Sequence, residues 1–144
     1  MAIDFTAQTY IDDVLTGRQV ACKWVRLAVE RHVKDLETGA ERGLRFDQVE
    51  AKKAIAFFSL LKHSKGEWAG QVITLEPWQQ FILWVLFGWK REDGTRRFRT
   101  AYQEIARKNG KSTIAAGVGL YLMIADGEPG AEIYTAATKR DQAR

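Results

Sequence analysis

Hydrophobic residues recur at helical spacing through the N-terminal half of the chain. Three segments, residues 6–15, 19–37 and 47–62, read as amphipathic helices, because apolar side chains recur at helical spacing with charged residues between them; within 19–37 the spacings are three, four and six. In the second helix the expected apolar face consists of Val20, Trp24, Leu27, Val33 and Leu36. In the third it consists of Ala51, Ile55, Phe58 and Leu61, and Asp47 is the expected N-cap.

A fourth helix is predicted from Pro77 to about Phe87, after a loop at residues 64–70. Proline suits the first turn of a helix, where its missing N–H has no intrahelical partner. The segment is apolar almost all round, which predicts that it is buried and that Trp84, like Trp24 and Trp89, packs in the core.

The pattern changes near residue 92. The sequence Glu-Asp-Gly-Thr at 92–95 predicts a turn, and Arg97–Ile105 then predicts a strand. A helix is expected over Gly110–Ala125, a strand over Ala131–Ala136, and a further helix from Thr138, where Asp141 completes a capping box.

The order strand, helix, strand indicates a βαβ unit and therefore a parallel sheet. The expected fold class is α/β, in which a helical lead-in is followed by the start of a parallel-sheet core of the P-loop NTPase type that is incomplete at residue 144. We expect two regions: residues 1–75, the helical lead-in, and residues 76–144, a partial ATPase domain.

Composition narrows the class of protein. The chain is 46% hydrophobic and 28% charged, which is typical of a folded globular protein rather than a disordered one. Its single cysteine, Cys22, excludes a disulfide framework. No apolar run predicts a signal peptide or a membrane span, so we expect a soluble intracellular protein without a membrane partner.

Positive charge is concentrated in one stretch. Residues 90–111 hold eight bases against three acids, whereas the whole chain has a net charge of only +4. Such clustering is typical of a protein that meets a polyanion, either a nucleotide or a phosphate backbone. One hypothesis is that Arg96, Arg97 and Arg99 face duplex DNA; the alternative is a solvated hairpin tip.

The segment from Ala106 to Thr113 (Ala-Arg-Lys-Asn-Gly-Lys-Ser-Thr) carries the candidate chemistry. A phosphate-binding loop requires backbone N–H groups at a helix N-terminus, a lysine that reaches the β- and γ-phosphates, and a hydroxyl group for Mg²⁺. Gly110, Lys111 and Ser112 supply these groups between a predicted strand and a predicted helix.

Two features favour a plain basic turn instead. The strict motif has a glycine five residues before Gly110, where this chain has Ile105. The predicted strand also contains Gln103 and Glu104, which are unusual in a buried parallel strand.

The same segment resembles the nucleotide loop of phage terminase large subunits, in which a basic Arg-Lys-Asn leads into Gly-Lys-Ser. Further stretches resemble this family: residues 75–83 look like its adenine-holding segment, 87–90 and 93–99 like its connecting hairpin, and 126–134 with 136–143 like its next strand and helix. The chain therefore resembles the N-terminal portion of this family of ATPases, which drive viral DNA into a procapsid.

The resemblance implies roles for individual residues. Lys111 would bind the β- and γ-phosphates, and Ser112 would hold Mg²⁺. Thr113 and the amides of Asn109 and Gly110 would complete the cradle. Arg107 would be a catalytic residue that stabilises charge on the transferred phosphoryl group. Gln79 would read the edge of adenine with Trp78 beneath it; core packing and a bond at the helix start are the alternative for both.

The resemblance also implies cofactors and partners. ATP and Mg²⁺ would be the cofactors. Double-stranded viral DNA, the terminase small subunit, the portal protein and further copies in a ring would be the partners, in the host cytoplasm and transiently at the procapsid. The acidic pair that orders Mg²⁺ and activates water is missing after Lys111, as is the family's nuclease domain, so we expect this chain alone to hydrolyse ATP poorly and to cut no DNA.

Two other functions fit the residues. One is another P-loop DNA-dependent ATPase, such as a helicase, or a small-molecule kinase. The other is a non-catalytic module that binds nucleic acid or protein through the basic hairpin and the helical lead-in.

Overall fold

A computed structural model of the chain describes residues 4–136. It is mostly helical and divides into two compact units, Met1–Glu104 and Ile105–Arg144. No helix within residues 4–136 is long and apolar enough to cross a membrane.

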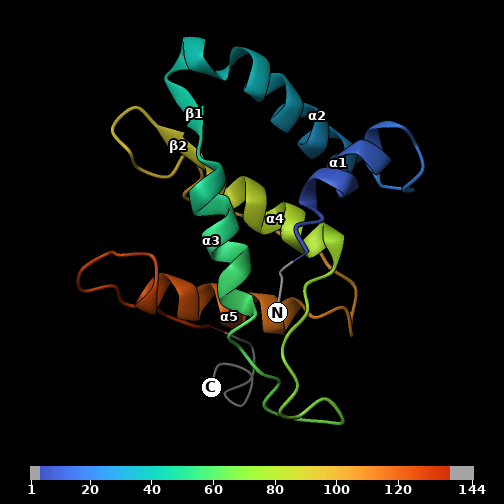
Figure 1. The fold of residues 1–144 in the computed structure, drawn as a ribbon, viewed down its shortest axis with the longest axis vertical. Coiled ribbons are helices and arrows are strands. Elements are labelled where there is room, and N and C mark those ends of the chain that lie inside the picture. The colour runs from blue at the N-terminus through green and yellow to red at the C-terminus, as the bar shows by residue number, and fades with distance from the viewer. Residues whose placement is uncertain (1–3, 137–144) are drawn as a thin grey trace. The chain divides into compact units, whose positions relative to one another are not determined.

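The first unit contains all elements up to residue 91 (Figure 1). They are α1 (Ala7–Leu15), α2 (Lys23–Thr38), the 3₁₀ helix η1 (Gly39–Arg42), β1 (Leu44–Phe46), α3 (Gln48–Phe58), α4 (Pro77–Gly88) and β2 (Trp89–Arg91). The second unit contains α5 (Lys111–Ile124). Residues 6–15, 47–62, 77–87 and 110–125 were predicted as helices, and each forms one within a few residues of the predicted bounds.

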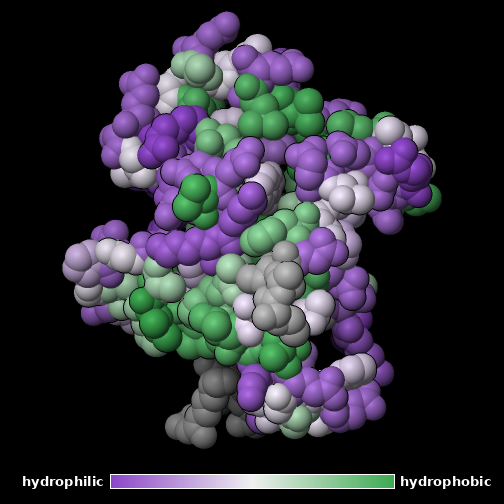
Figure 2. Space-filling model, viewed as in Figure 1, coloured by the Kyte–Doolittle hydropathy of each residue, from purple (hydrophilic) through white to green (hydrophobic). Residues whose placement is uncertain are grey.

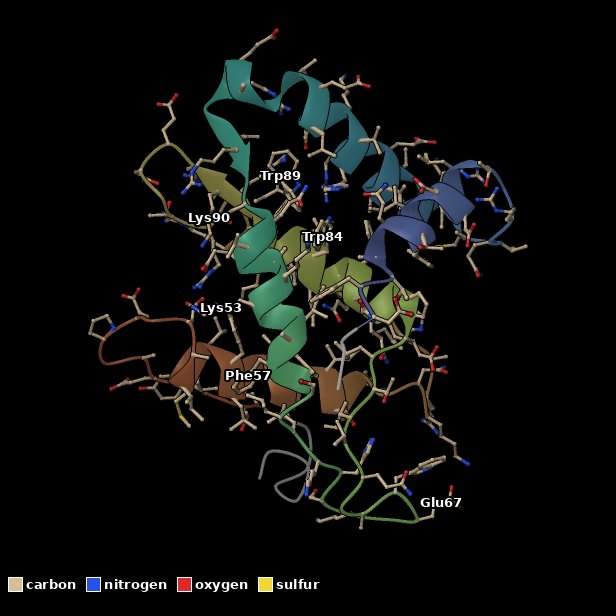
Figure 3. The ribbon with its side chains drawn as sticks, viewed as in Figure 1. Lys53, Phe57, Glu67, Trp84, Trp89 and Lys90 are labelled. Atoms are coloured by element: carbon tan, nitrogen blue, oxygen red, sulfur yellow. The ribbon has the colours of Figure 1, made fainter. Side chains whose placement is uncertain are left out.

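Helix α4 is the centre of the first unit and packs against α3 and α1. Its start is fixed by Pro77 in the first turn and by a capping box between Glu76 and Gln79. The predicted burial is confirmed, because most of its side chains are inaccessible to solvent. The large buried apolar residues of α4 and of the helices packed against it are Phe81, Leu83, Trp84, Phe87, Ile11, Ile55 and Phe58. Figure 3 labels Trp84 together with Trp89 of β2.

The start of α3 follows the prediction. The Asp47 carboxylate accepts hydrogen bonds from the backbone N–H groups of Val49 and Glu50, both at 3.1 Å. Ala51, Ile55 and Phe58 are buried as expected.

The predicted apolar face of the second helix is wrong. Val20 is 89% exposed, Trp24 74% and Leu36 51%, whereas the buried residues of α2 are Val29, His32 and Asp35. Two polar side chains can occupy the core because each has a hydrogen-bonding partner there. The indole N–H of Trp89 donates to His32 Nδ1 (2.9 Å), and Arg97 and Arg42 donate to Asp35.

Among the described residues, the strands form one two-stranded antiparallel sheet. In it β1 pairs with β2 in the register Leu44 to Arg91 and Phe46 to Trp89. Gly88 immediately precedes β2. A Cβ atom at this position would lie 2.3 Å from the Phe46 ring, so only glycine allows the backbone to come this close to the ring.

The parallel βαβ core is not present in residues 4–136, and the predicted strands Arg97–Ile105 and Ala131–Ala136 do not form. The predicted turn at 92–95 is confirmed by the hydrogen bond from Arg91 N–H to the Thr95 carbonyl (2.9 Å). After the turn, Arg96 forms an isolated antiparallel bridge with Lys90, and the Arg97 N–H donates to the Trp89 carbonyl (3.0 Å). The Arg97 side chain pairs with Asp35, while Gln103 and Glu104 are exposed. The helix predicted from Thr138 lies outside the described residues.

Candidate functional site

The segment before α5 is a tight turn built on two left-handed residues. Lys108 has φ of 66° and Gly110 has φ of 72°. Glycine adopts this conformation without steric cost, whereas for lysine it is uncommon. The Asn109 amide donates to the carbonyls of Ala106 (3.5 Å) and Arg107 (3.4 Å), bonds that are long and therefore weak.

Helix α5 begins at Lys111 without a side-chain cap. Gly110 is its N-cap residue, and its carbonyl accepts the first intrahelical bond, from Ile114 N–H at 2.9 Å. Since glycine has no side chain to cap them, the N–H groups of the first turn receive no side-chain oxygen from the N-cap position. The partial positive charge of a helix N-terminus adds to these donors, so an oxyanion placed there would be stabilised.

The side chains around this N-terminus are accessible. Arg107, Lys108, Lys111 and Ser112 are exposed, and Thr113 is half-buried. Ile114, Gly117 and Tyr121 share one face of α5 and are buried, so this helix packs through that face. In Figure 2, hydrophobic side chains gather over α5, where Leu120, Met123 and Ile124 are exposed.

Magnesium fits this donor set only in part. Mg²⁺ prefers hard oxygen ligands and is commonly held by a few protein oxygens together with substrate phosphates. The exposed Ser112 hydroxyl is such an oxygen. Among residues 4–136 no group of three or more His, Cys, Asp and Glu side chains could hold a metal ion.

Gln79 lies in the first unit and has a structural task there. Its Oε1 accepts a hydrogen bond from the backbone N–H of Glu76 (2.9 Å), and its side chain is buried. Its amide NH₂ is the group that could donate to a ring nitrogen of a base. Trp78 beside it is half-buried.

Sequence reasoning passed over the neighbouring Gln80. Its amide donates to the carbonyls of Asp4 (3.0 Å) and Leu75 (3.3 Å), and its Oε1 accepts from Thr6 N–H (3.0 Å). Gln80 thereby holds the start of the chain against α4. A cavity of about 370 Å³ opens at this junction and is lined by Leu75, Glu76, Pro77 and Gln80 among others, but not by Gln79. No local sequence pattern would have singled out Gln80 over Gln79.

The basic stretch does not present its arginines uniformly. The side chain of Arg97 is only 15% exposed and is engaged with Asp35, whereas Arg99 is exposed and Arg96 half-buried. Part of the Arg97 guanidinium is therefore engaged with Asp35, and contact of the three arginines with DNA stays a prediction.

Comparison with known proteins gives one match. Residues 77–144 match the family model described as terminase large subunit, ATPase domain. Neither a curated protein nor a solved structure matches the chain significantly.

Proposed function

We propose that this chain binds Mg-ATP through the loop at residues 106–113 and belongs to a motor that packages viral double-stranded DNA, because residues 77–144 match the family model of the terminase large subunit ATPase domain. The observation that supports this most strongly is an exposed lysine and an exposed serine at the uncapped N-terminus of a 14-residue helix. A nucleoside triphosphate would supply phosphate oxygens that accept hydrogen bonds from the N–H groups of this uncapped first turn.

Within the loop we assign one role to each residue. Lys111 meets the β- and γ-phosphates as a mobile cation, and Ser112 holds Mg²⁺ through its hydroxyl. The amides of Asn109 and Gly110, with Thr113, complete the cradle. Arg107 places its guanidinium where charge develops on the transferred phosphoryl group, so it contributes to turnover more than to binding.

We further propose that the start of α4 receives the adenine. Gln79 already accepts a bond from Glu76, so it would meet the base mainly as a donor, through its amide NH₂. We also propose that residues 1–75 form a helical lead-in and that residues 76–144 are part of an ATPase domain.

The partners follow from the proposed motor. They are viral duplex DNA, the terminase small subunit, the portal protein and other copies of this chain in a ring. The place of action is the host cytoplasm and the procapsid.

The test is calorimetric titration of the chain with Mg-ATP. Lys111→Ala should weaken binding about tenfold to a hundredfold, because a lost hydrogen bond to a charged group is worth about 1.5–3 kcal/mol. Lys65→Ala is the matched control: it removes an exposed lysine outside the loop and should leave the affinity within about twofold. Equal affinity of the wild type and Lys111→Ala, with both proteins folded by circular dichroism, would contradict the proposal.

A further inference from the structure

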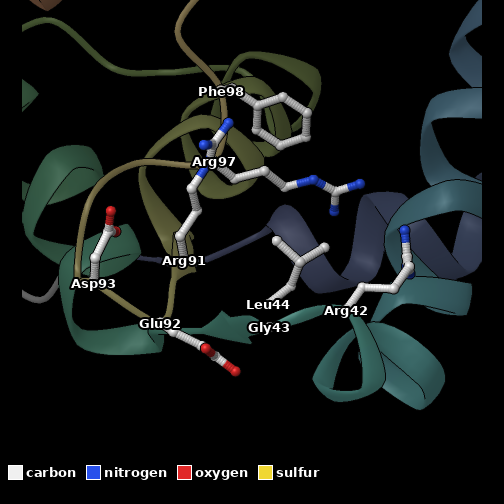
Figure 4. A pocket seen from close by; sticks show the side chains of 8 residues that line it. All are labelled: Arg42, Gly43, Leu44, Arg91, Glu92, Asp93, Arg97 and Phe98. Atoms are coloured by element: carbon white, nitrogen blue, oxygen red, sulfur yellow. The ribbon is translucent and has the colours of Figure 1, made fainter.

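A cavity of about 680 Å³ opens on the first unit beside the turn that follows β2 (Figure 4). Three of its lining residues are arginines, Arg42, Arg91 and Arg97, and Leu44 and Phe98 supply apolar surface. No residue of the loop at 106–113 lines it. The cavity is therefore separate from the nucleotide loop, and its volume lies in the range of sites for small molecules.

A buried carboxylate positions two of these arginines. Asp35 is 4% exposed; its Oδ1 accepts from Arg42 Nη2 and its Oδ2 from Arg97 Nη1. One carboxylate between two guanidinium groups leaves one positive charge uncompensated. Each guanidinium has five N–H donors, so most of them remain for another acceptor.

Aromatic rings fix the orientation of Arg97 further. Its guanidinium carbon lies 5.4 Å from the centre of the Trp89 ring and 4.8 Å from that of Phe98. Stacking uses the faces of the planar guanidinium and leaves its N–H edges for hydrogen bonds. Figure 4 shows Arg42 and Arg97 reaching from opposite sides into the space over Leu44. Donors held in this way lose little conformational entropy when an anion binds.

The two acids at the rim are turned elsewhere. Asp93 accepts from the backbone N–H (2.9 Å) and the hydroxyl (2.7 Å) of Thr95, within its own turn. Glu92 lies against Gly43, and Figure 4 shows its carboxylate directed away from the guanidinium groups. Together with Asp35 these two acids balance the charge of the three arginines, so an anion would be held here by the guanidinium N–H donors and not by a net positive charge.

We propose that this cavity is a second anion site, which binds the phosphate group of a nucleic-acid backbone or of a phosphorylated small molecule. Arg42 and Arg97 are its forked donors, and Arg91 is its third positive charge. Guanidinium forks match the geometry of phosphate oxygens, and paired arginines bind phosphate more strongly than single surface charges do. The site stands independently of ATP binding, since its residues and those of the loop are different.

The experiment measures binding of inorganic phosphate, by chemical shifts of the arginine N–H groups, and of a short labelled duplex, by anisotropy at constant salt. Both are carried out on the Lys111→Ala protein, so that the nucleotide loop contributes little. Arg42→Gln and Arg91→Gln should each weaken phosphate binding about threefold to tenfold. Glu92→Gln should strengthen it about twofold, because removing an acid raises the local potential.

Arg45→Gln is the matched control. Arg45 follows Leu44 on β1, so its side chain points to the opposite face of the strand, where it pairs with Asp47 at 3.2 Å. A parallel loss of phosphate and duplex binding in Arg42→Gln identifies a nucleic-acid backbone as the source. A loss of phosphate binding alone identifies a free phosphorylated ligand. The proposal is overturned if neither probe binds, or if Arg45→Gln loses as much affinity as Arg42→Gln.

Discussion

Asp35 connects three parts of the first unit through single side-chain contacts. From α2 it accepts hydrogen bonds from Arg42 in η1 and from Arg97 after the turn. Burial raises the pKa of its carboxyl group, but hydrogen bonds from Arg97 and Arg42 outweigh this effect and hold the pKa below its usual value. Removing the charge would leave the largely buried Arg97 without its counter-ion.

We therefore expect Asp35→Asn to lower the free energy of unfolding by about 3 kcal/mol. Urea denaturation measures this. Asp13→Asn is the control, since Asp13 and its partner Arg18 are 32% and 65% exposed and such surface pairs contribute about 0–1 kcal/mol. Similar losses in both variants would show that burial of the Asp35 pair has no special effect.

His32 makes stability depend on pH. Burial, with a smaller contribution from Arg97, lowers its pKa from 6.5 to about 4, although Asp35 opposes the shift. A proton on Nδ1 would also break the hydrogen bond from the Trp89 indole. The unfolded chain takes up this proton near pH 6.5 and the folded chain only near pH 4, so stability is lost as the pH falls between these values.

Between pH 7 and pH 5 the loss attributable to His32 should be about 2 kcal/mol. His32→Gln retains an acceptor for Trp89 but cannot titrate, so its unfolding free energy should change much less over this range. His63→Gln serves as the reference and should keep the dependence of the wild type. A wild-type stability that is flat from pH 7 to pH 5 would contradict the shift of the His32 pKa.

At the level of elements, the junction of α4 and β2 depends on close packing at Gly88. A Cβ atom there would meet two atoms of the Phe46 ring at 2.3 and 2.5 Å. That ring is itself packed against His32, Trp84 and Trp89, so it has little room to move. Gly88→Ala should therefore lower the free energy of unfolding by about 1–3 kcal/mol.

Gly39→Ala provides the comparison for Gly88→Ala. Gly39 has helical φ and ψ, and a Cβ atom there would meet the Trp89 ring at an ordinary 3.4 Å. The thermal midpoint of Gly39→Ala should stay near that of the wild type, whereas that of Gly88→Ala should fall by several degrees. The reverse order would mean that the β1–α4 contact is not tight.

The elements that sequence reasoning predicted well are those in which one periodic face meets the core. Helix α3 is the example, because Ala51, Ile55 and Phe58 are buried as their spacing indicates. It failed for the buried face of α2, since His32 and Asp35 are polar and their partners lie 57 and 62 positions away. It failed for the strand at 97–105 because, among the described residues, backbone pairing with β2 reaches only Arg96 and Arg97.

At the scale of the whole molecule, the first unit contains the cluster of His32, Phe46, Trp84 and Trp89, whose rings contact one another within that unit. A chain that ends at Glu104 should therefore fold on its own. Tryptophan fluorescence should report one cooperative urea transition for it, with a blue-shifted emission in the native state. Gradual, non-cooperative unfolding would show that residues 105–144 are needed for this core.

The candidate nucleotide loop was predictable because its parts are local. Gly110, Lys111 and Ser112 are adjacent in sequence, and the helix that follows them carries a clear apolar pattern. The proposed second anion site was not predictable, since it unites residues from η1, β1, β2 and the segment that follows β2, and it depends on the buried Asp35, which is outside the apolar face predicted for its helix.

The location of nucleotide binding tests the central claim most directly. Amide chemical shifts of the isotope-labelled chain should be recorded during titration with Mg-ATP and, separately, with adenosine. We expect Mg-ATP to shift the amides of Asn109 to Thr113, since phosphate oxygens would accept their N–H groups, and adenosine to leave them unchanged. The account is contradicted if Mg-ATP binds while these amides keep their positions, or if they respond equally in Lys111→Ala.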